Sequence, residues 1–200
     1  MIEAAITEIR EGRPVVLPTD TVYGLCADPY REPPVRELYR IKGRPPERPT
    51  ALLVRDLELL LECVPELRGR AATLARALLP GPYTLILPNP AQRYRWLGGS
   101  TPNKIGVRVP ELLGPGAEVL ERAGALAATS ANHHGGPDPR RLEDVPVEIR
   151  ASAAAVVDGG ELPGTPSTVL DLTGEEPKVL REGAVPAAEA LERALAATAG

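Results

Sequence analysis

The sequence predicts one α/β domain in which helices cover both faces of a mixed β-sheet. Leu, Ile and Val supply 50 of the 200 residues, more than a disordered chain carries. Short apolar runs alternate with amphipathic segments along the whole chain, as in sheets flanked by helices. A predicted hairpin near the C-terminus makes the sheet mixed. We find no internal repeat and no linker, so the domain spans residues 1–200.

The helices are predicted from apolar residues at helical spacing and from capping residues at their ends. In the first helix Ile2, Ile6 and Ile9 share one face, and Gly12 ends it. Asp56 has the side chain of an N-cap and is expected to begin another helix. The other predicted helices span residues 34–41, 66–79, 115–123, 141–151 and 187–197.

The strands are predicted from short apolar runs that are bounded by proline, glycine and polar residues. These runs are residues 14–18, 51–54, 83–87, 104–109, 125–129, 154–157, 167–172 and 178–180. The last two form the hairpin, with residues 173–176 as its turn. Residues 18–24 are expected to form a polar loop after the first strand.

Composition excludes several classes of protein. Cys26 and Cys63 cannot build a disulfide framework, and no CxxC motif is present for structural zinc. The longest stretch without a charged residue, 77–92, contains four prolines and is not expected to span a membrane. The N-terminus carries acidic residues and does not resemble a signal peptide. We therefore expect a soluble, cytoplasmic protein.

Charge composition adds two expectations. A net charge of −4 argues against extensive coating of nucleic acid. Twenty arginines against three lysines, with only four Asn and Gln residues in total, are typical of a thermophile or of a GC-rich genome.

Five strand ends carry more polar side chains than a turn needs. Ligand sites of α/β sheets lie in the loops at strand ends, so these segments are candidate parts of a site. They are residues 18–24, residues 40–49, the strand around Arg108, residues 127–136, and residues 167–169 with 181–183.

The first two segments each allow two interpretations. Residues 18–24 offer Thr19, Asp20 and Thr21, either as a turn closed by its own side chains or as ligand contacts. Residues 40–49 hold four cations, and the prolines among them keep the loop extended. That loop is either a solvated basic segment or a preset clamp for a phosphate chain.

The next two segments combine charge with small residues. An arginine inside an apolar strand is costly unless it is paired, so Arg108 meets either an internal carboxylate or the carboxylate of a ligand. Residues 127–136 begin as a strand of small residues and continue with two hydroxyl groups, an amide and two glycines. The small residues and glycines allow close approach of a ligand to the backbone. His133 and His134 are adjacent and project apart, so we expect them at the surface and not at a metal.

The polar residues suit catalysis by positioning and electrostatics. Strand pairing is expected to bring Ser167 and Arg181 to the same end of the sheet. Neither Ser130 nor Ser167 lies in a G-x-S-x-G motif, and the Walker pattern G-x-x-x-x-G-K-[ST] is absent. Hydroxyls, amides and permanent cations remain, and these groups act on polyanionic substrates without a protein nucleophile. The residues alone therefore predict binding of a phosphorylated ligand.

Seven motifs, taken in order, resemble the YrdC-like family of L-threonylcarbamoyladenylate synthases from about Gly12 to Gly183. They are PTDTVYGL at 18–25, KGRP at 42–45, PGPYTLIL at 80–87, GVRVP at 106–110, TSAN at 129–132, STVLDL at 167–172 and LREGA at 180–184. The resemblance implies a twisted mixed sheet with a concave, basic cavity. Because the chain ends near residue 200, we expect the short, single-domain form of the family.

The resemblance also implies an activity. Members of the family are nucleotidyltransferases that bind ATP, L-threonine and bicarbonate and form threonylcarbamoyl-AMP and pyrophosphate, with Mg²⁺ carried by ATP. Their product serves tRNA processing, namely the N6-threonylcarbamoyladenosine at position 37. The implied partners are the downstream tRNA threonylcarbamoyl transferase machinery and, through RNA binding, tRNA or double-stranded RNA.

Roles of single residues follow by position in the motifs. Catalytic roles fall on Lys42 and Arg44, beside the phosphates of ATP. The threonine-binding residues would be Thr21, Arg108, Ala128 through its backbone, and Ser167. The ATP-binding residues would be Arg44, Arg48, Ser130, Asn132, Asp138 and Arg181. No protein residue is expected to bind a metal, since Mg²⁺ would arrive with ATP.

Four positions depart from the family's pattern. Lys104 replaces a small hydroxyl residue and could add a phosphate contact, and Leu53 replaces a histidine of some members. His134 and Asp138 replace serines, and Asp138 would repel a triphosphate unless Mg²⁺ intervenes. These departures bear on the efficiency of the enzyme and not on its fold.

Two other functions are compatible with this fold. One is a paralogue that handles carbamoyl-adenylate. The other is a non-catalytic protein that binds double-stranded RNA or the ribosome through the basic cavity. Residues 31–55 carry seven cations against three acids, which favours RNA binding. The chain has only one Trp, five Tyr and no Phe for stacking on bases, which argues against it.

Overall fold

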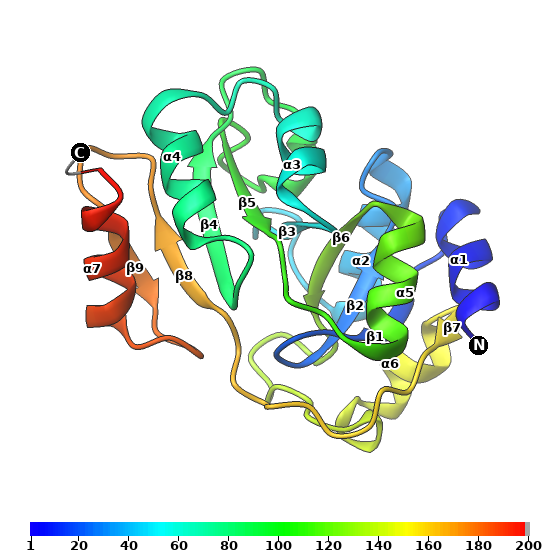
Figure 1. Ribbon diagram of the computed structural model, residues 1–200. Helices are drawn as coiled ribbons and strands as arrows, with labels where there is room; N and C mark the ends of the chain where they lie inside the picture. Colours follow the sequence, from blue (N-terminus) through cyan, green and yellow to red (C-terminus); the bar gives the residue numbers. More distant parts are fainter. Residues whose placement is uncertain (199–200) are drawn as a thin grey trace.

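A computed structural model describes residues 1–198 of the chain. Its nine strands form one mixed sheet in the order β7-β1-β2-β6-β3-β5-β4-β8-β9 (Figure 1). The strands are β1 (Val15–Pro18), β2 (Tyr23–Ala27), β3 (Ala51–Val54), β4 (Tyr83–Pro88), β5 (Lys104–Arg108), β6 (Ala125–Ser130), β7 (Ala155–Val156), β8 (Thr168–Asp171) and β9 (Lys178–Arg181). Strands β1 and β7, β3 and β5, and β4 and β8 pair in parallel, whereas the other neighbours are antiparallel. The mixed sheet is therefore confirmed.

Helices flank this sheet. They are α1 (Ile2–Arg10), α2 (Glu32–Lys42), α3 (Leu57–Cys63), α4 (Gly69–Leu78), α5 (Gly114–Ala123), α6 (Val147–Ser152) and α7 (Ala187–Ala196), with short 3₁₀ helices at Arg95–Leu97 and Leu142–Asp144. Among residues 1–198, no helix has the length and apolar character that crossing a membrane requires.

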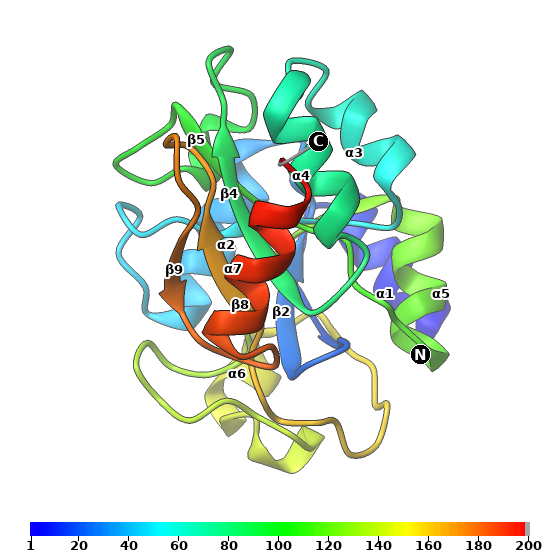
Figure 2. The same cartoon turned by 60° about the vertical axis from the view of Figure 1, so that its left-hand side comes forward.

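The asymmetric cover of the sheet creates the space for a site. One face carries a continuous core with side chains from α2, α3, α4, α6 and α7. Helices α1 and α5 lie side by side on the other face, over β1, β2, β3 and β6 (Figures 1 and 2). On that second face Thr84, Gly106 and Val169 line a cavity. The sheet is flanked by helices as predicted, but the helices leave this part of one face open.

Two elements differ from the prediction. Tyr23–Ala27 forms the buried strand β2, although Tyr23 and Gly24 were assigned to a loop. Glycine, cysteine and alanine have little strand propensity, and only pairing with β1 and β6 makes this segment extended. The helix predicted over 141–151 is interrupted at Pro146, because proline disfavours the helical conformation in the residue before it. Helix α6 begins after Pro146.

Asp56 caps helix α3 as predicted, since its Oδ1 accepts a hydrogen bond from the Leu59 amide at 2.7 Å. We expect Asp56→Ala to lower the free energy of unfolding by about 1 kcal/mol, measured by urea denaturation, because the amide loses its acceptor. Asp56→Asn should retain most of that stability. An equal loss in Asp56→Asn would mean that the ion pair with Arg55, and not the cap, is the stabilising contact.

Candidate functional site

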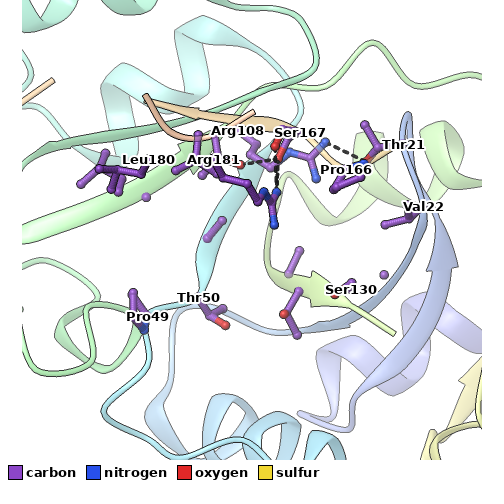
Figure 3. Close-up of a pocket in the computed structure, with 18 of the residues that line it drawn as sticks. Thr21, Val22, Pro49, Thr50, Arg108, Ser130, Pro166, Ser167, Leu180 and Arg181 are labelled. Carbon is purple, nitrogen blue, oxygen red and sulfur yellow. Dashed lines mark hydrogen bonds between the residues drawn. The ribbon is translucent and has the colours of Figure 1, made fainter. Parts of the chain in front are cut away.

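The open part of the sheet forms the floor of a cavity of about 450 Å³. Figure 3 shows side chains that converge on it from strands and loops distant in the sequence. The charged residues that line it are Arg44, Lys104, Arg108, Asp138, Asp171 and Arg181. Its hydroxyl-bearing residues are Thr19, Thr21, Thr50, Thr84, Thr101, Thr129, Ser130 and Ser167. Four cations and two carboxylates therefore line the cavity.

Strand β5 carries a cation at each end of the cavity floor. Lys104, Gly106 and Arg108 alternate with buried apolar residues, so they project from the same face of the strand. Four residues of extended strand separate the Cα atoms of these two residues by ~13 Å. Each is paired with a carboxylate, Lys104 with Asp171 at 3.0 Å and Arg108 with Asp20 at 2.6 Å.

Arg108 meets an internal carboxylate and also keeps bonding capacity for a ligand. Its Nη2 donates to Asp20 Oδ1 at 2.6 Å and to Thr21 Oγ1 at 3.3 Å, and both ionic side chains are about nine-tenths buried. Arg108 Nε and Asp20 Oδ2 are buried without a hydrogen-bond partner. Of the two alternatives for this arginine, the internal carboxylate is therefore present, and Nη1 and Nε have no partner within the described part of the chain.

The loop that contains Thr21 is closed by its own side chains and nevertheless lines the cavity. Thr19 Oγ1 donates to the Val22 carbonyl at 2.7 Å and accepts from the amides of Thr21 and Val22, each at 3.3 Å. This threonine turn directs the Thr21 hydroxyl towards Arg108 (Figure 3). The turn closed by its own side chains is therefore present, and a contact of this segment with a ligand stays a prediction.

Arg44 lies in the cavity wall with an unused donor. Its Nη1 donates to Thr129 Oγ1 at 3.1 Å and its Nη2 to the Pro49 carbonyl at 2.7 Å, whereas Nε has no partner. Burial lowers the pKa of this guanidinium because desolvation disfavours the charged form. A partly desolvated cation held by neutral acceptors is suited to take an anionic ligand.

Ser167 and Arg181 meet at one end of the sheet, as predicted from strand pairing. Arg181 Nη2 donates to the Ser167 carbonyl at 2.8 Å (Figure 3). The hydroxyls of Ser167 and Thr84 lie 2.7 Å apart. Burial also lowers the pKa of Arg181. A Cβ atom at Gly183 would lie 2.1 Å from the Pro166 carbonyl oxygen, so only glycine allows this contact.

Lys42 lies behind the cavity wall. Its side chain is buried, and Nζ donates to Asn132 Oδ1 at 2.7 Å and to the carbonyls of Asn132 at 3.0 Å and Ser130 at 2.5 Å. Burial lowers its pKa to about 8. Asn132 Nδ2 in turn donates to the Gly136 carbonyl at 2.7 Å. Lys42 and Asn132 thus fix the loop that carries Ser130, and neither lines the cavity.

The remaining predicted residues divide between the cavity and its surroundings. Ala128, Ser130 and Asp138 line the cavity, whereas Arg48 is exposed outside it. Asp171 and Thr84 line it as well, although we assigned them no role from sequence. The rule that an isolated charge in an apolar strand needs a partner could have identified Asp171, as it did Arg108.

The two histidines and Cys26 lie outside the cavity lining. His133 and His134 are exposed, as expected. Cys26 is fully buried in the core, and burial raises the pKa of its thiol to about 12. Within residues 1–198 no group of three or more His, Cys, Asp or Glu side chains could hold a metal.

The fold and the site define a class: α/β proteins with a cavity on the open face of a mixed sheet, lined by cations and hydroxyl groups. The family model Sua5/YciO/YrdC, described as telomere recombination, matches residues 7–183. The chain belongs to this family, and the resemblance seen in its seven motifs is confirmed.

Individual relatives match nearly the whole chain. A threonylcarbamoyl-AMP synthase of Pyrococcus abyssi is 37% identical over 94% of this chain and 55% of its own length. A threonylcarbamoyl-AMP synthase of Bacillus subtilis is 32% identical over 92% of this chain and 54% of its own length. The crystal structure of P. abyssi Sua5 complexed with L-threonine has a TM-score of 0.87 at 34% identity, over 96% of this chain and 56% of that one. The chain thus spans about half the length of these relatives.

Proposed function

We propose that the protein is a threonylcarbamoyl-AMP synthase, which joins L-threonine, bicarbonate and ATP to give threonylcarbamoyl-AMP and pyrophosphate. The observation that carries the proposal is that one cavity holds three arginines, Arg44, Arg108 and Arg181, among hydroxyl groups. Relatives with this name support it, as does the L-threonine bound to the P. abyssi protein. The product would serve the modification of tRNA at adenosine 37.

L-Threonine would occupy the end of the cavity at Arg108. Arg108 Nη1, which has no hydrogen-bond partner within residues 1–198 and is not among the buried unpaired atoms, would donate to the carboxylate of the amino acid. Thr21, Ser167 and the backbone of Ala128 line the same cavity and offer acceptors and donors for the amine and the hydroxyl.

ATP would bind with its phosphates at Arg44, Arg181 and Ser130. In the reaction, an oxygen of the carbamate formed on threonine's amine attacks the α-phosphorus. The bond from this phosphorus to the bridging oxygen breaks, and pyrophosphate leaves with the electron pair. The guanidinium groups stabilise the charge that develops on the phosphate oxygens. Positioning by the cavity wall supplies the remainder of the catalysis, so no protein nucleophile is required.

Mg²⁺ would enter with ATP. Mg²⁺ sites of this kind use one or two carboxylates, substrate phosphates and water. Although no protein ligand for the metal is expected from the sequence, Asp138 lines the same cavity as Arg44 and Ser130 and fits this limited role. When bound, the ion would neutralise phosphate charge that Asp138 would otherwise repel.

Release of pyrophosphate tests the proposal. We expect release that depends on threonine, bicarbonate and ATP together, and we expect Arg44→Met to raise the KM for ATP about tenfold through loss of charged hydrogen bonds. Arg40→Met is the matched control, because Arg40 lies exposed in the last turn of α2, just before the loop that carries Arg44, and pairs with Glu37. Release without threonine, or no release, would contradict the proposal.

A further inference from the structure

The loop between β7 and β8, residues 157–167, has no regular secondary structure and runs along one end of the sheet (Figures 1 and 2). Its last two residues, Pro166 and Ser167, line the cavity. Gly160 and Gly164 have φ angles of 75° and 81°, in the backbone region that favours glycine. Glycine loses more conformational freedom on folding than any other residue, so the position of this loop depends on the contacts that hold it.

A buried hydroxyl group holds the start of the β7–β8 loop. Tyr23 on β2 is fully buried, which raises its pKa to about 12 and keeps the phenol protonated near neutral pH. Its Oη accepts a hydrogen bond from the Gly159 amide at 3.0 Å, and its O–H faces two acceptors, Asp158 Oδ1 at 2.9 Å and the Gly160 carbonyl oxygen at 2.8 Å. Hydrogen bonds from the Gly160 amide and from Tyr23 lower the pKa of Asp158. One phenol thus binds three consecutive residues of the loop.

A second side-chain anchor of the loop is exposed. Glu161 pairs with Arg140 at 2.8 Å and with Arg141 at 2.5 Å, but all three side chains are about half exposed. Ion pairs of this kind contribute little to stability, because water screens both charges. The Tyr23 hydroxyl is therefore the stronger of these two anchors.

The end of the β7–β8 loop connects this anchor to the proposed threonine site. The Gly164 amide donates a hydrogen bond to the Thr21 carbonyl at 2.8 Å. The Thr21 hydroxyl accepts from Arg108, and Figure 3 shows Pro166 and Thr21 at the same end of the cavity. Gly160, which contacts the phenol, and Gly164 are only four residues apart. Loss of the first contact would therefore loosen the second.

We infer that Tyr23 is a positioning residue for L-threonine, an inference that rests on the proposed function. Its hydroxyl holds the start of the β7–β8 loop. The loop in turn holds the backbone of Thr21 and supplies Pro166 to the wall of the threonine site. Tyr23 itself does not line the cavity, so any effect of its hydroxyl on the ligand passes through this loop.

Tyr23→Phe tests the inference, because it keeps the buried ring and removes only the hydroxyl. We expect faster amide hydrogen exchange in residues 158–164. In calorimetric titration, the Kd for L-threonine should rise about tenfold, the effect of one lost hydrogen bond. The Kd for ATP should change by less than about twofold, because the hydrogen bonds of Arg44 and Arg181 do not involve residues 158–164.

Tyr83→Phe is the matched control. Tyr83 is also a buried tyrosine on a strand, but its hydroxyl has no hydrogen-bond partner among residues 1–198. The substitution therefore removes the same atom without releasing a loop, and hydrogen exchange and both Kd values should equal those of the unmodified protein.

The carboxylate that faces the Tyr23 hydroxyl provides a second test. Asp158 is exposed, so its substitution should leave the fold intact. Asp158→Ala removes an acceptor and should raise the Kd for L-threonine, as Tyr23→Phe does. Asp158→Asn keeps the Oδ1 acceptor and should bind L-threonine as tightly as the unmodified protein.

Three results for Tyr23→Phe would overturn the inference. One is unchanged hydrogen exchange in residues 158–164, and another is an unchanged Kd for L-threonine. The third is an equal loss of affinity for ATP, which would indicate a general change of the cavity. Each Kd is measured with one ligand and without turnover. The absence of pyrophosphate release from the unmodified protein would therefore contradict the proposed function, whereas these three results contradict the inference alone.

Discussion

Replacing Arg108 with methionine should lower the free energy of unfolding by about 3–5 kcal/mol and abolish threonine-dependent release of pyrophosphate. The side chains of Arg108 and Asp20 are 11% and 8% exposed and lie 2.6 Å apart. Removing one partner leaves the other as an uncompensated buried charge, which is the costly way to break such a pair. Urea denaturation measures the first effect, and a pyrophosphate assay the second.

A double variant separates the two effects. Asp20→Asn in the Arg108→Met background removes the charge that the single variant leaves unpaired, so most of the stability should return. Threonine-dependent turnover should not return, because the guanidinium is still absent. A single variant as stable as the unmodified protein would show that the pair does not stabilise the fold. Threonine-dependent release of pyrophosphate by the double variant would show that Arg108 does not bind threonine.

The sequence predicted which segments supply the site but not how they meet. Arg108 was expected to need a carboxylate, and it pairs with Asp20, a residue 88 positions away. That contact depends on the strand order β1-β2-β6-β3-β5, which no local pattern contains. Short-range patterns specify hydrophobic faces and turns, whereas the order of strands follows from packing of the whole chain.

The strand β2 shows why local propensity fails near a site. The segment from Thr19 to Ala27 combines hydroxyls, a glycine and a cysteine, which are typical of a loop. A Cβ atom at Gly24 would lie 3.2 Å from Thr19 Cγ2, a tight contact, and Gly24 lines the cavity. The small and polar residues that line the cavity thus lower the strand propensity of this segment. Hydrogen bonding of β2 to β1 on one edge and to β6 on the other keeps it extended.

Sequence motifs also do not distinguish a residue that contacts a ligand from one that positions it. Lys42 and Arg44 belong to one motif, and both were expected at the phosphates of ATP. Arg44 lines the cavity, whereas the ammonium of Lys42 bonds to Ser130 and Asn132. The catalytic role of Lys42 remains a prediction from the resemblance, and the contacts of Lys42 favour a positioning role.

Lys42→Met should lower the free energy of unfolding by about 3 kcal/mol and raise the KM for ATP. The substitution keeps the length of the side chain but removes the donor to the two backbone carbonyls and the Asn132 amide oxygen, and buried acceptors without a donor are costly. The loop from Ser130 to Asp138 would then lose its anchor, and both of these residues line the cavity. Denaturation curves and steady-state kinetics measure the two effects.

The ratio of the two kinetic constants distinguishes positioning from direct catalysis. A lysine that only fixes the loop affects ATP binding and stability together, so kcat at saturating ATP should fall less than kcat/KM. Lys178→Met is the control, because Lys178 is exposed on β9 and does not line the cavity, and it should change stability by less than about 0.5 kcal/mol. If Lys42→Met is as stable as the unmodified protein and loses kcat with an unchanged KM, the ammonium instead contacts the phosphates in the transition state.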